Sequence, residues 1–309
     1  MVVGKQRTTS SGPGPDQEAQ IKAQVREFYD SIGWKQVGDG IFQNARYEDL
    51  RPVSQEYIER CHARVSRHLP QTGDYLLDAG SGPIQYPAYL AYSSGFKKRV
   101  CLDISHRALV EARERIGEHG MFVVGDAARL PFRADAFDAL VSMHTVHHLP
   151  PEEQVRAFHD FLRVLKIGAP AVVVNSWGPH SLLMRLATPA IKFNVRAIRL
   201  YRKLTGQKVR EKKGSAARAV PTGTHIYRYG YKWFRTHLSD LPGLEVGVWR
   251  SVSTTFLRAC IHRRLGGRLW LRLIYWVEET FPHWMGKSGQ YALIRFEKTG
   301  QSWEKGSDA

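Results

Sequence analysis

The sequence predicts an α/β protein built on a doubly wound, mostly parallel sheet, and two observations lead to this fold class. Five short apolar runs between residues 75 and 175 are flanked by turn residues, which is typical of strands buried on both faces of a parallel sheet. Segments with helical spacing lie between these runs, and such alternation indicates strand–helix–strand units. A length of 309 residues fits one large domain, or one domain with a substantial addition.

The expected elements follow in order along the chain. Helical spacing is found first at 19–32 and 54–68. The five buried strands are expected at 75–80, 99–103, 121–125, 138–142 and 169–175. Helices are expected between them at 105–116 and 151–165, and the second begins with Pro151 and two acidic residues, a favourable helix N-terminus.

The pattern changes after residue 175. A long helix is expected over 181–204, bent or broken at Pro189. A short helix follows at 231–238. The last two strands are expected at 244–250 and 290–298, with an Arg- and Trp-rich helical stretch between them at 258–284.

Composition excludes several classes of protein. Apolar residues make up 43% of the chain and charged residues 24%, which is ordinary for a globular protein with a full core. No run of 18 uncharged apolar residues occurs, and the N-terminus lacks the apolar stretch of a signal peptide, so we expect a cytoplasmic protein. Cys61, Cys101 and Cys260 are too few and too far apart for a disulfide framework or a cysteine-rich zinc site.

The net charge of +16 is concentrated in one segment. Residues 181–275 contain 20 Lys and Arg but three Asp and Glu. Five basic residues of the expected long helix share one stripe, at Arg185, Lys192, Arg196, Arg199 and Lys203. This concentration indicates an anionic partner: a membrane surface, a nucleic acid or a phosphorylated substrate.

Glycines and carboxylates gather where the expected strands end. Gly80 and Gly82 follow Asp78 at the end of the first strand, and such a pair lets the backbone turn sharply and approach a ligand. Asp103 ends the second strand, where a carboxylate can accept both hydroxyls of a ribose. Asp126 follows the third, where it can accept an adenine amino hydrogen. Carboxylates that simply face solvent are the alternative, but three in register with the glycines favour a ligand site.

The motifs LLDAGSG, CLDIS, VVGDAARLPF, FDALVSMHTVHHL and FLRVLKIGA occur in this order. Together they resemble the class I S-adenosylmethionine (SAM)-dependent methyltransferases, in the branch with quinone and small-molecule methyltransferases. The resemblance covers 73–178 and implies a Rossmann-like sheet of seven strands with an antiparallel closing strand. It also implies SAM as cofactor, bound by Asp78, Gly80, Ser81, Gly82, Asp103, Ile104, Asp126, Ala127 and His144, with Tyr29 from an N-terminal lid. Pro83-Ile84 departs from the family pattern, in which a third glycine is common here.

The chain is divided accordingly. We expect a disordered tail at 1–17, an N-terminal helical lid at 18–72 and the SAM-binding core at 73–178. These are followed by a basic helical insertion at 179–243, a closing unit with a second helical insertion at 244–298, and a tail at 299–309.

Histidines follow the expected fourth strand. His147 and His148 match a pair that, in some O-methyltransferases of this branch, resembles a general base, and an imidazole suits proton removal from a hydroxyl. Both side chains being structural is the alternative. We expect no metal site at His144, His147 and His148, because no nearby cysteine or acid completes a ligand set. Residues expected near the acceptor are Asn175, Ser176, Trp177, His180, His225, Tyr227 and Tyr229. Trp34, like Tyr29, is a weaker candidate for the N-terminal lid that the resemblance implies over the cofactor.

Three functions remain open. The favoured one is methyl transfer, preferably to oxygen, on a small or lipid-linked acceptor, with the basic helices as a peripheral membrane dock. A tRNA or RNA methyltransferase is the second, although no zinc-knuckle, KH or RRM signature is found. A non-catalytic SAM-binding interaction protein is the third. Basic helices that pack on their own domain and leave their charges in solvent are the alternative to any docking role. The sequence does not indicate an oligomeric state.

Overall fold

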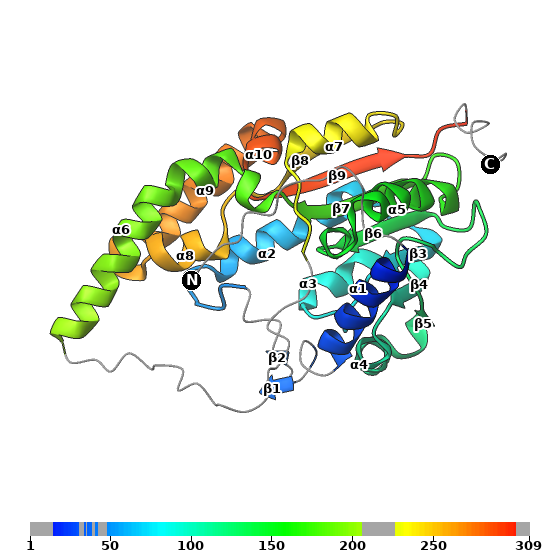
Figure 1. The fold of residues 1–309 in the computed structure, drawn as a ribbon, viewed down its shortest axis with the longest axis horizontal. Coiled ribbons are helices and arrows are strands. Elements are labelled where there is room, and N and C mark those ends of the chain that lie inside the picture. Colours follow the sequence, from blue (N-terminus) through cyan, green and yellow to red (C-terminus); the bar gives the residue numbers. More distant parts are fainter. Residues whose placement is uncertain are drawn as a thin grey trace.

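The computed structural model describes residues 15–30, 34, 36–38, 41–42, 48–205 and 226–300. Seven strands form the central sheet: β3 (Gly73–Ala79), β4 (Phe96–Asp103), β5 (Gly120–Val124), β6 (Ala139–Met143), β7 (Pro170–Ser176), β8 (Glu245–Arg250) and β9 (Tyr291–Glu297). Their spatial order is β5-β4-β3-β6-β7-β9-β8 (Figure 1). The first five strands are parallel, and β9 lies antiparallel between β7 and β8, as predicted.

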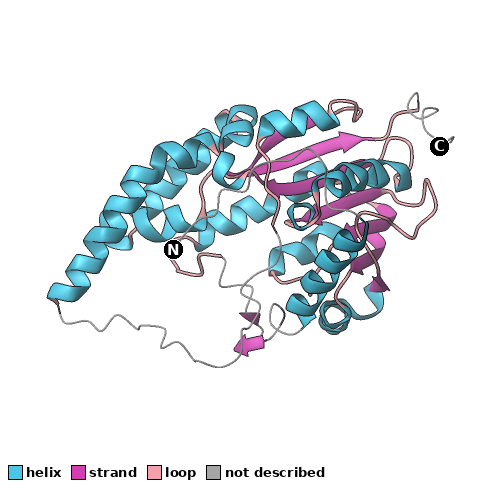
Figure 2. Ribbon diagram, viewed as in Figure 1, coloured by secondary structure: helices cyan, strands magenta, loops and turns pink. Residues whose placement is uncertain are grey.

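Helices cover both faces of this sheet (Figure 2). They are α1 (Pro15–Phe28), α2 (Gln55–Ala63), α3 (Pro87–Leu90), α4 (His106–Ile116), α5 (Pro151–Val164), α6 (Leu182–Leu204), α7 (Tyr231–Leu238), α8 (Thr254–Cys260), α9 (Gly267–Thr280) and α10 (Pro282–Ser288). A short antiparallel pair, β1 (Gln36–Gly38) with β2 (Ile41–Phe42), was not predicted from the sequence.

Alternation along the strands divides the core into two layers. Leu77 packs in the layer covered by α5 and α7, with Phe158 and Phe234. Its neighbour Leu76 packs in the layer covered by α2, α4 and α8, where Leu257 lies. All seven residues of β7 are buried, which explains its nearly continuous apolar sequence. Because β3 to β7 are parallel, their carboxyl ends meet at one edge of the sheet.

Helix α1 is joined to this edge by polar contacts. Lys22 forms ion pairs with Asp126, after β5, and with Glu153 of α5. The hydroxyl of Ser105 donates a hydrogen bond to Asp30, just beyond the helix. Helix α1 begins at Pro15, four residues before the start of the helix predicted at 19–32, and proline is favourable in a first helical turn.

The basic segment forms helices at the side of the sheet remote from β5 (Figure 1). Helix α6 continues through Pro189, so of the two expected outcomes, a break or a bend, the break does not occur. Its inner side packs on α8, where Asn194 contacts Cys260 and Met184 accepts a hydrogen bond from the backbone N–H of Ser253. The predicted stretch 258–284 is divided into α8, α9 and α10. No helix in the described part of the chain is both long and apolar enough to cross a bilayer.

Candidate functional site

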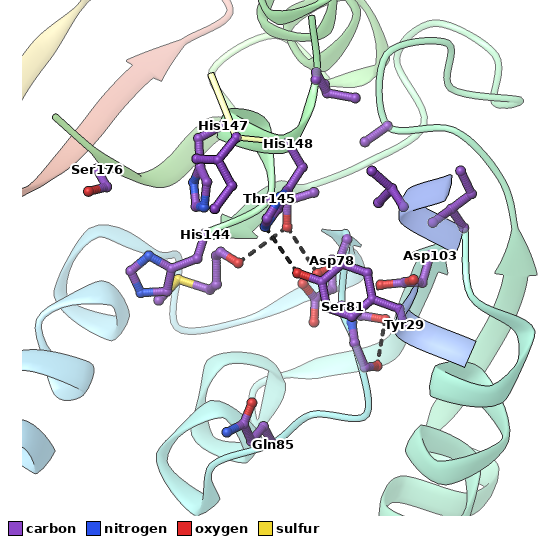
Figure 3. Close-up of a pocket in the computed structure, with 18 of the residues that line it drawn as sticks. Tyr29, Asp78, Ser81, Gln85, Asp103, His144, Thr145, His147, His148 and Ser176 are labelled. Atoms are coloured by element: carbon purple, nitrogen blue, oxygen red, sulfur yellow. Dashed lines mark hydrogen bonds between the residues drawn. The ribbon is translucent and has the colours of Figure 1, made fainter. Parts of the chain in front are cut away.

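A cavity of about 710 Å³ lies at the carboxyl ends of the parallel strands, and residues of α1 form part of its lining. It is lined by all twelve residues that the sequence predicted for catalysis or cofactor binding: Tyr29, Asp78, Gly80, Ser81, Gly82, Asp103, Ile104, Asp126, Ala127, His144, His147 and His148. In Figure 3, Asp103 and Ser81 lie on one side of this site, and His144, His147 and Ser176 on the other.

The loop after β3 is shaped by its glycines. Gly80 and Gly82 have φ angles of +78° and +53°, which side chains other than glycine rarely tolerate. A Cβ at Gly80 would lie 2.3 Å from the side chain of Thr145, and one at Gly82 would lie 3.0 Å from the indole of Trp34. Both glycines are therefore required for the backbone to pass this close to the cavity wall.

Asp103 presents a buried carboxylate at the end of β4. Its oxygens accept hydrogen bonds from the backbone N–H groups of Gly82 and Ser105, each at 2.8 Å. Burial raises the pKa of Asp103 to about 6, although these two hydrogen bonds act in the opposite direction. The backbone donors fix the carboxylate between the glycine loop and the start of α4.

Asp78 is held by a buried ion pair with Arg99 of β4, through both Nε and Nη2 of the guanidinium. Arg99 also donates a hydrogen bond to the carbonyl of Tyr89 at 2.6 Å. Arg99 therefore compensates the charge of Asp78 at the point where the glycine loop begins.

Asp126 was expected to accept a hydrogen bond from an adenine ring, but both of its carboxylate oxygens have partners within the protein. Its Oδ1 accepts a hydrogen bond from the N–H of Ala128 at 2.8 Å, and its Oδ2 pairs with Lys22. In this arrangement the carboxylate fastens α1 over the end of the cavity.

Two of the three histidines are held neutral by their surroundings. His144 has a φ of +58°, and its ring packs edge-on against Trp249 and Tyr291. Burial, followed by the charge on Arg250, lowers the pKa of His144 to about 3. Burial, followed by the charges on His148 and Arg228, holds the pKa of His147 well below its ordinary range.

His148 has a different partner from its neighbour. Its Nε2 lies 3.0 Å from the hydroxyl of Tyr29, and the two rings meet edge to face. Tyr29 in turn stacks on Trp34. This contact joins the N-terminal segment to the turn after β6.

Beyond His144 the cavity continues between residues that were not predicted from the sequence. They are Glu48, Tyr86, Tyr89, Ile226, Arg228, Arg250, Ser253, Thr254, Thr255, Gln290 and Tyr291. They come from separate parts of the chain and are brought together by tertiary packing alone. No local motif marked them, and only the concentration of basic residues pointed to the segment that supplies Arg228 and Arg250.

The residues expected near the acceptor are only partly at the cavity. Ser176 lines it, and so does Trp34, which was expected with Tyr29 at the cofactor lid. Trp177 is instead buried in the core and donates a hydrogen bond to the carbonyl of Gly286 at 2.7 Å. Four others are also absent from its lining, namely Asn175, His180, Tyr227 and Tyr229. His225 lies outside the described residues.

Residues 77–173 match the family described as "Methyltransferase domain". The core of this chain is a class I SAM-dependent methyltransferase domain. The matched range begins inside β3 and ends inside β7, so it contains the strand ends that form the site.

Two curated relatives share this part of the chain. A ubiquinone/menaquinone biosynthesis C-methyltransferase of Cereibacter sphaeroides is 31% identical over 133 residues, which cover 41% of this chain and 52% of the relative. A tRNA (carboxymethyluridine(34)-5-O)-methyltransferase of Xenopus tropicalis is 28% identical over 135 residues, which cover 39% of this chain and 21% of the relative. The chain thus spans about half, or less, of the length of these relatives.

The fold is also similar to a solved structure. Phosphoethanolamine N-methyltransferase 1 of Haemonchus contortus, in complex with phosphoethanolamine and S-adenosylhomocysteine (SAH), has a TM-score of 0.56. Its sequence identity is 12%, and the match covers 95% of this chain and 52% of that one. The similarity at this identity concerns the fold of the methyltransferase domain.

The residues present fit SAM. Two glycines that could not carry a Cβ bring the backbone to the cavity wall. The buried Asp103 carboxylate beside them is suited to accept hydrogen bonds from a ribose diol. This combination of a close backbone and a buried acceptor is what an adenosyl group requires.

Proposed function

We propose that this protein transfers a methyl group from SAM to a small or lipid-linked acceptor at a membrane surface, with oxygen as the favoured methyl-accepting atom. The main support is that the twelve predicted site residues line one cavity, which continues past His144 and His147. The continuation provides space for an acceptor beside the cofactor.

The proposed mechanism depends on alignment and proton removal. SAM supplies the methyl group and its own leaving group. Asp103 and the glycine loop hold the adenosyl part, and the wall beyond His144 orients the acceptor. The neutral imidazole of His147 accepts the proton of the acceptor hydroxyl, while His148 holds the lid through Tyr29.

The membrane part of the proposal rests on the outer side of α6. Five exposed apolar residues recur at spacings of four and seven, which places them within one stripe: Leu182, Leu186, Phe193, Leu200 and Leu204. The basic stripe from Arg185 to Lys203 is also exposed, about a quarter turn away around the helix. An apolar stripe beside a row of cations suits the interface of a bilayer with anionic lipids.

Helix α9 carries a similar pattern. Leu269, Leu273 and Trp276 are 69%, 47% and 61% exposed and share one side of the helix. Arg268 and Arg272 lie beside them in the helical sequence. Both helices thus expose apolar side chains that a protein interior normally buries. We propose that this dock is peripheral and lies on the cytoplasmic face of the membrane.

An RNA methyltransferase is the second candidate. The relative from Xenopus tropicalis is a tRNA methyltransferase, and the basic residues of α6 are equally suited to bind phosphates. The exposed apolar stripe favours the membrane over RNA, because phosphate-binding surfaces do not require it. A non-catalytic SAM-binding protein remains the third candidate.

The proposed function is tested by incubating the purified protein with methyl-labelled SAM and total host extract, followed by separation of organic and aqueous phases. Label in the organic phase supports a lipid-linked acceptor. Aqueous label that is lost on ribonuclease treatment favours RNA, and aqueous label that survives favours a soluble small molecule. Bound SAM with no labelled product would favour the non-catalytic protein.

A further inference from the structure

Two arginines, Arg250 and Arg228, line the cavity beyond His144, and they differ in whether a carboxylate of the protein pairs with them. Arg250 at the end of β8 forms a buried ion pair with Glu48. Its guanidinium also lies over the rings of Trp249 and Tyr291, 5.1 and 4.8 Å from their centroids. The charge of Arg250 is therefore compensated within the protein.

Arg228 has no such compensation. It makes no ion pair with a carboxylate of the described residues, and its Nε is buried without a hydrogen-bond partner among them. The acidic groups of the same cavity have other partners. Glu48 pairs with Arg250, Asp78 with Arg99 and Asp126 with Lys22, and Asp103 accepts two backbone hydrogen bonds. A partly buried guanidinium without a counter-ion is costly unless a ligand completes its contacts.

The position of Arg228 is fixed by its neighbours. The N–H of Tyr227 donates a hydrogen bond to the carbonyl of His147 at 2.8 Å, and the side-chain amide of Gln154 donates one to the carbonyl of Tyr227 at 2.9 Å. The Arg228 side chain then passes over Gly178, where a Cβ would lie 2.3 Å from its Cδ. These contacts hold the arginine beside the turn that carries the histidines.

The charge of Arg228 acts on this turn. It is one of the causes that lower the pKa of both His144 and His147. The positive charge of Arg228 therefore acts on the part of the cavity beside these histidines. Ile226, Tyr86 and Tyr291 add apolar and aromatic side chains to the lining of the same cavity.

We propose that Arg228 binds an anionic group of the acceptor, a carboxylate or a phosphate, and so selects acceptors that carry one. This inference rests on the proposed function, because it assigns Arg228 to the acceptor rather than to the cofactor. A guanidinium offers two parallel N–H donors to such a group, and the aromatic walls hold the apolar body of the molecule. An anion in this place supplies the missing counter-ion.

The test uses the full-length protein saturated with SAH and titrates it with benzoate, phenyl phosphate and benzamide. We expect an anionic probe to bind at least about tenfold more tightly than neutral benzamide, and the better anion identifies the preferred group. Arg228→Leu should weaken anion binding at least about tenfold, a difference of about 1.4 kcal/mol, and Arg228→Lys should retain part of it. Arg235→Leu, at an exposed position of α7, is the matched control and should bind as the wild type does.

The outcomes separate the two proposals. Loss of anion binding in Arg228→Leu with unchanged SAH affinity supports the assignment. Anion binding that is absent from the wild type, or unchanged in Arg228→Leu, overturns it. A fall in SAH affinity in Arg228→Leu also overturns it, because Arg228 would then bind the carboxylate of the cofactor. Failure of the wild type to bind SAH would instead refute the proposed function on which the assignment rests.

Discussion

The protonation state of Asp103 should make cofactor affinity depend on pH. Its pKa in the folded protein is about 6, above the ordinary 3.8, so the carboxylate is present above about pH 6 and is protonated as the pH falls through that value. The same shift has the opposite effect on folding: it favours the folded state progressively as the pH falls from about 6 towards 4. A protonated carboxyl loses the charge with which it accepts ribose hydroxyls.

We therefore predict that SAH affinity falls about tenfold between pH 7 and pH 5, because only about a tenth of a group with this pKa is ionised at pH 5. Calorimetric titration at both values measures it. Asp103→Asn should bind SAH more weakly at pH 7 and show little change between the two values. An equal pH dependence in Asp103→Asn would assign the effect to another group.

His147 is predicted to act on the rate rather than on cofactor binding. His147→Ala should lower kcat by about 10²–10⁴-fold with the acceptor identified from the extract, the range expected for loss of a general base. SAH affinity should stay within about twofold of wild type. Partial recovery of the rate with added imidazole would distinguish a missing base from a distorted site. An unchanged kcat would show that His147 is structural.

The parallel strands were well predicted because the sequence patterns that indicate them are local. Val-rich runs with turn residues at both ends located β3 to β7, and the glycines and carboxylates at their ends located the cofactor part of the cavity. Strand β4 begins at Phe96, three residues before its predicted start at 99. The prediction missed these residues because Lys97 and Lys98 interrupt the apolar run.

The acceptor wall could not be predicted in the same way. Glu48, Tyr86, Arg228 and Arg250 come from four distant segments, and their meeting depends on how the insertions fold back on the sheet. Trp177 was misplaced because its position after β7 suggested the site, whereas its large ring is buried in the core. The local periodicity of the sequence does not indicate which distant residues meet, or which side chain is buried in the core.

A buried network joins α2, α9 and the end of β8. Glu278 accepts hydrogen bonds from the hydroxyl of Tyr57 at 2.6 Å and the N–H of Ser251 at 2.8 Å, and it pairs with Arg64 at 2.9 Å. Glu278 and Arg64 are 0% and 3% exposed. The helical insertion is thereby attached to the sheet through a charge pair with no access to water.

Glu278→Ala should lower the free energy of unfolding by about 3–5 kcal/mol. The variant leaves the buried Arg64 charge with the more exposed Glu279 as its carboxylate partner, and it leaves the donors of Tyr57 and Ser251 without their acceptor. Urea unfolding followed by circular dichroism measures the change. Glu56→Ala is the control: Glu56 pairs with Arg60 and Arg272 in exposed positions, and its loss should cost less than about 1 kcal/mol. Equal effects of the two substitutions would contradict the role given to the buried network.

Helices α6 and α9 lie beside the sheet (Figure 1), and their exposed surface combines basic residues with exposed apolar ones. The sequence predicted the basic stripe of α6, but not which of its apolar residues would remain exposed. The contacts of Met184 and Asn194 with the α8 region identify the packed side, which leaves the stripe from Leu182 to Leu204 facing outward.

We predict that the protein binds vesicles containing anionic lipid and that the binding weakens as salt is raised. Replacing Leu186 and Phe193 together by serine should weaken it at least about tenfold, because the bilayer no longer covers two large apolar side chains. Ile167→Ser, at a position 69% exposed in the turn before β7, is the matched control and should leave vesicle binding unchanged. Flotation with and without anionic lipid measures both variants. Equal flotation of the double variant and wild type would exclude the α6 stripe as the dock.

The proposed function depends on binding of SAM in the cavity at the strand ends. Calorimetric titration of the wild-type protein and of Asp103→Ala with SAM at pH 7.5 measures this binding. We predict one site per chain in the wild type and an affinity at least about tenfold weaker in Asp103→Ala, since the variant lacks the carboxylate that accepts the ribose hydroxyls. No binding to the wild type, or equal binding to both proteins, would contradict SAM binding at this site.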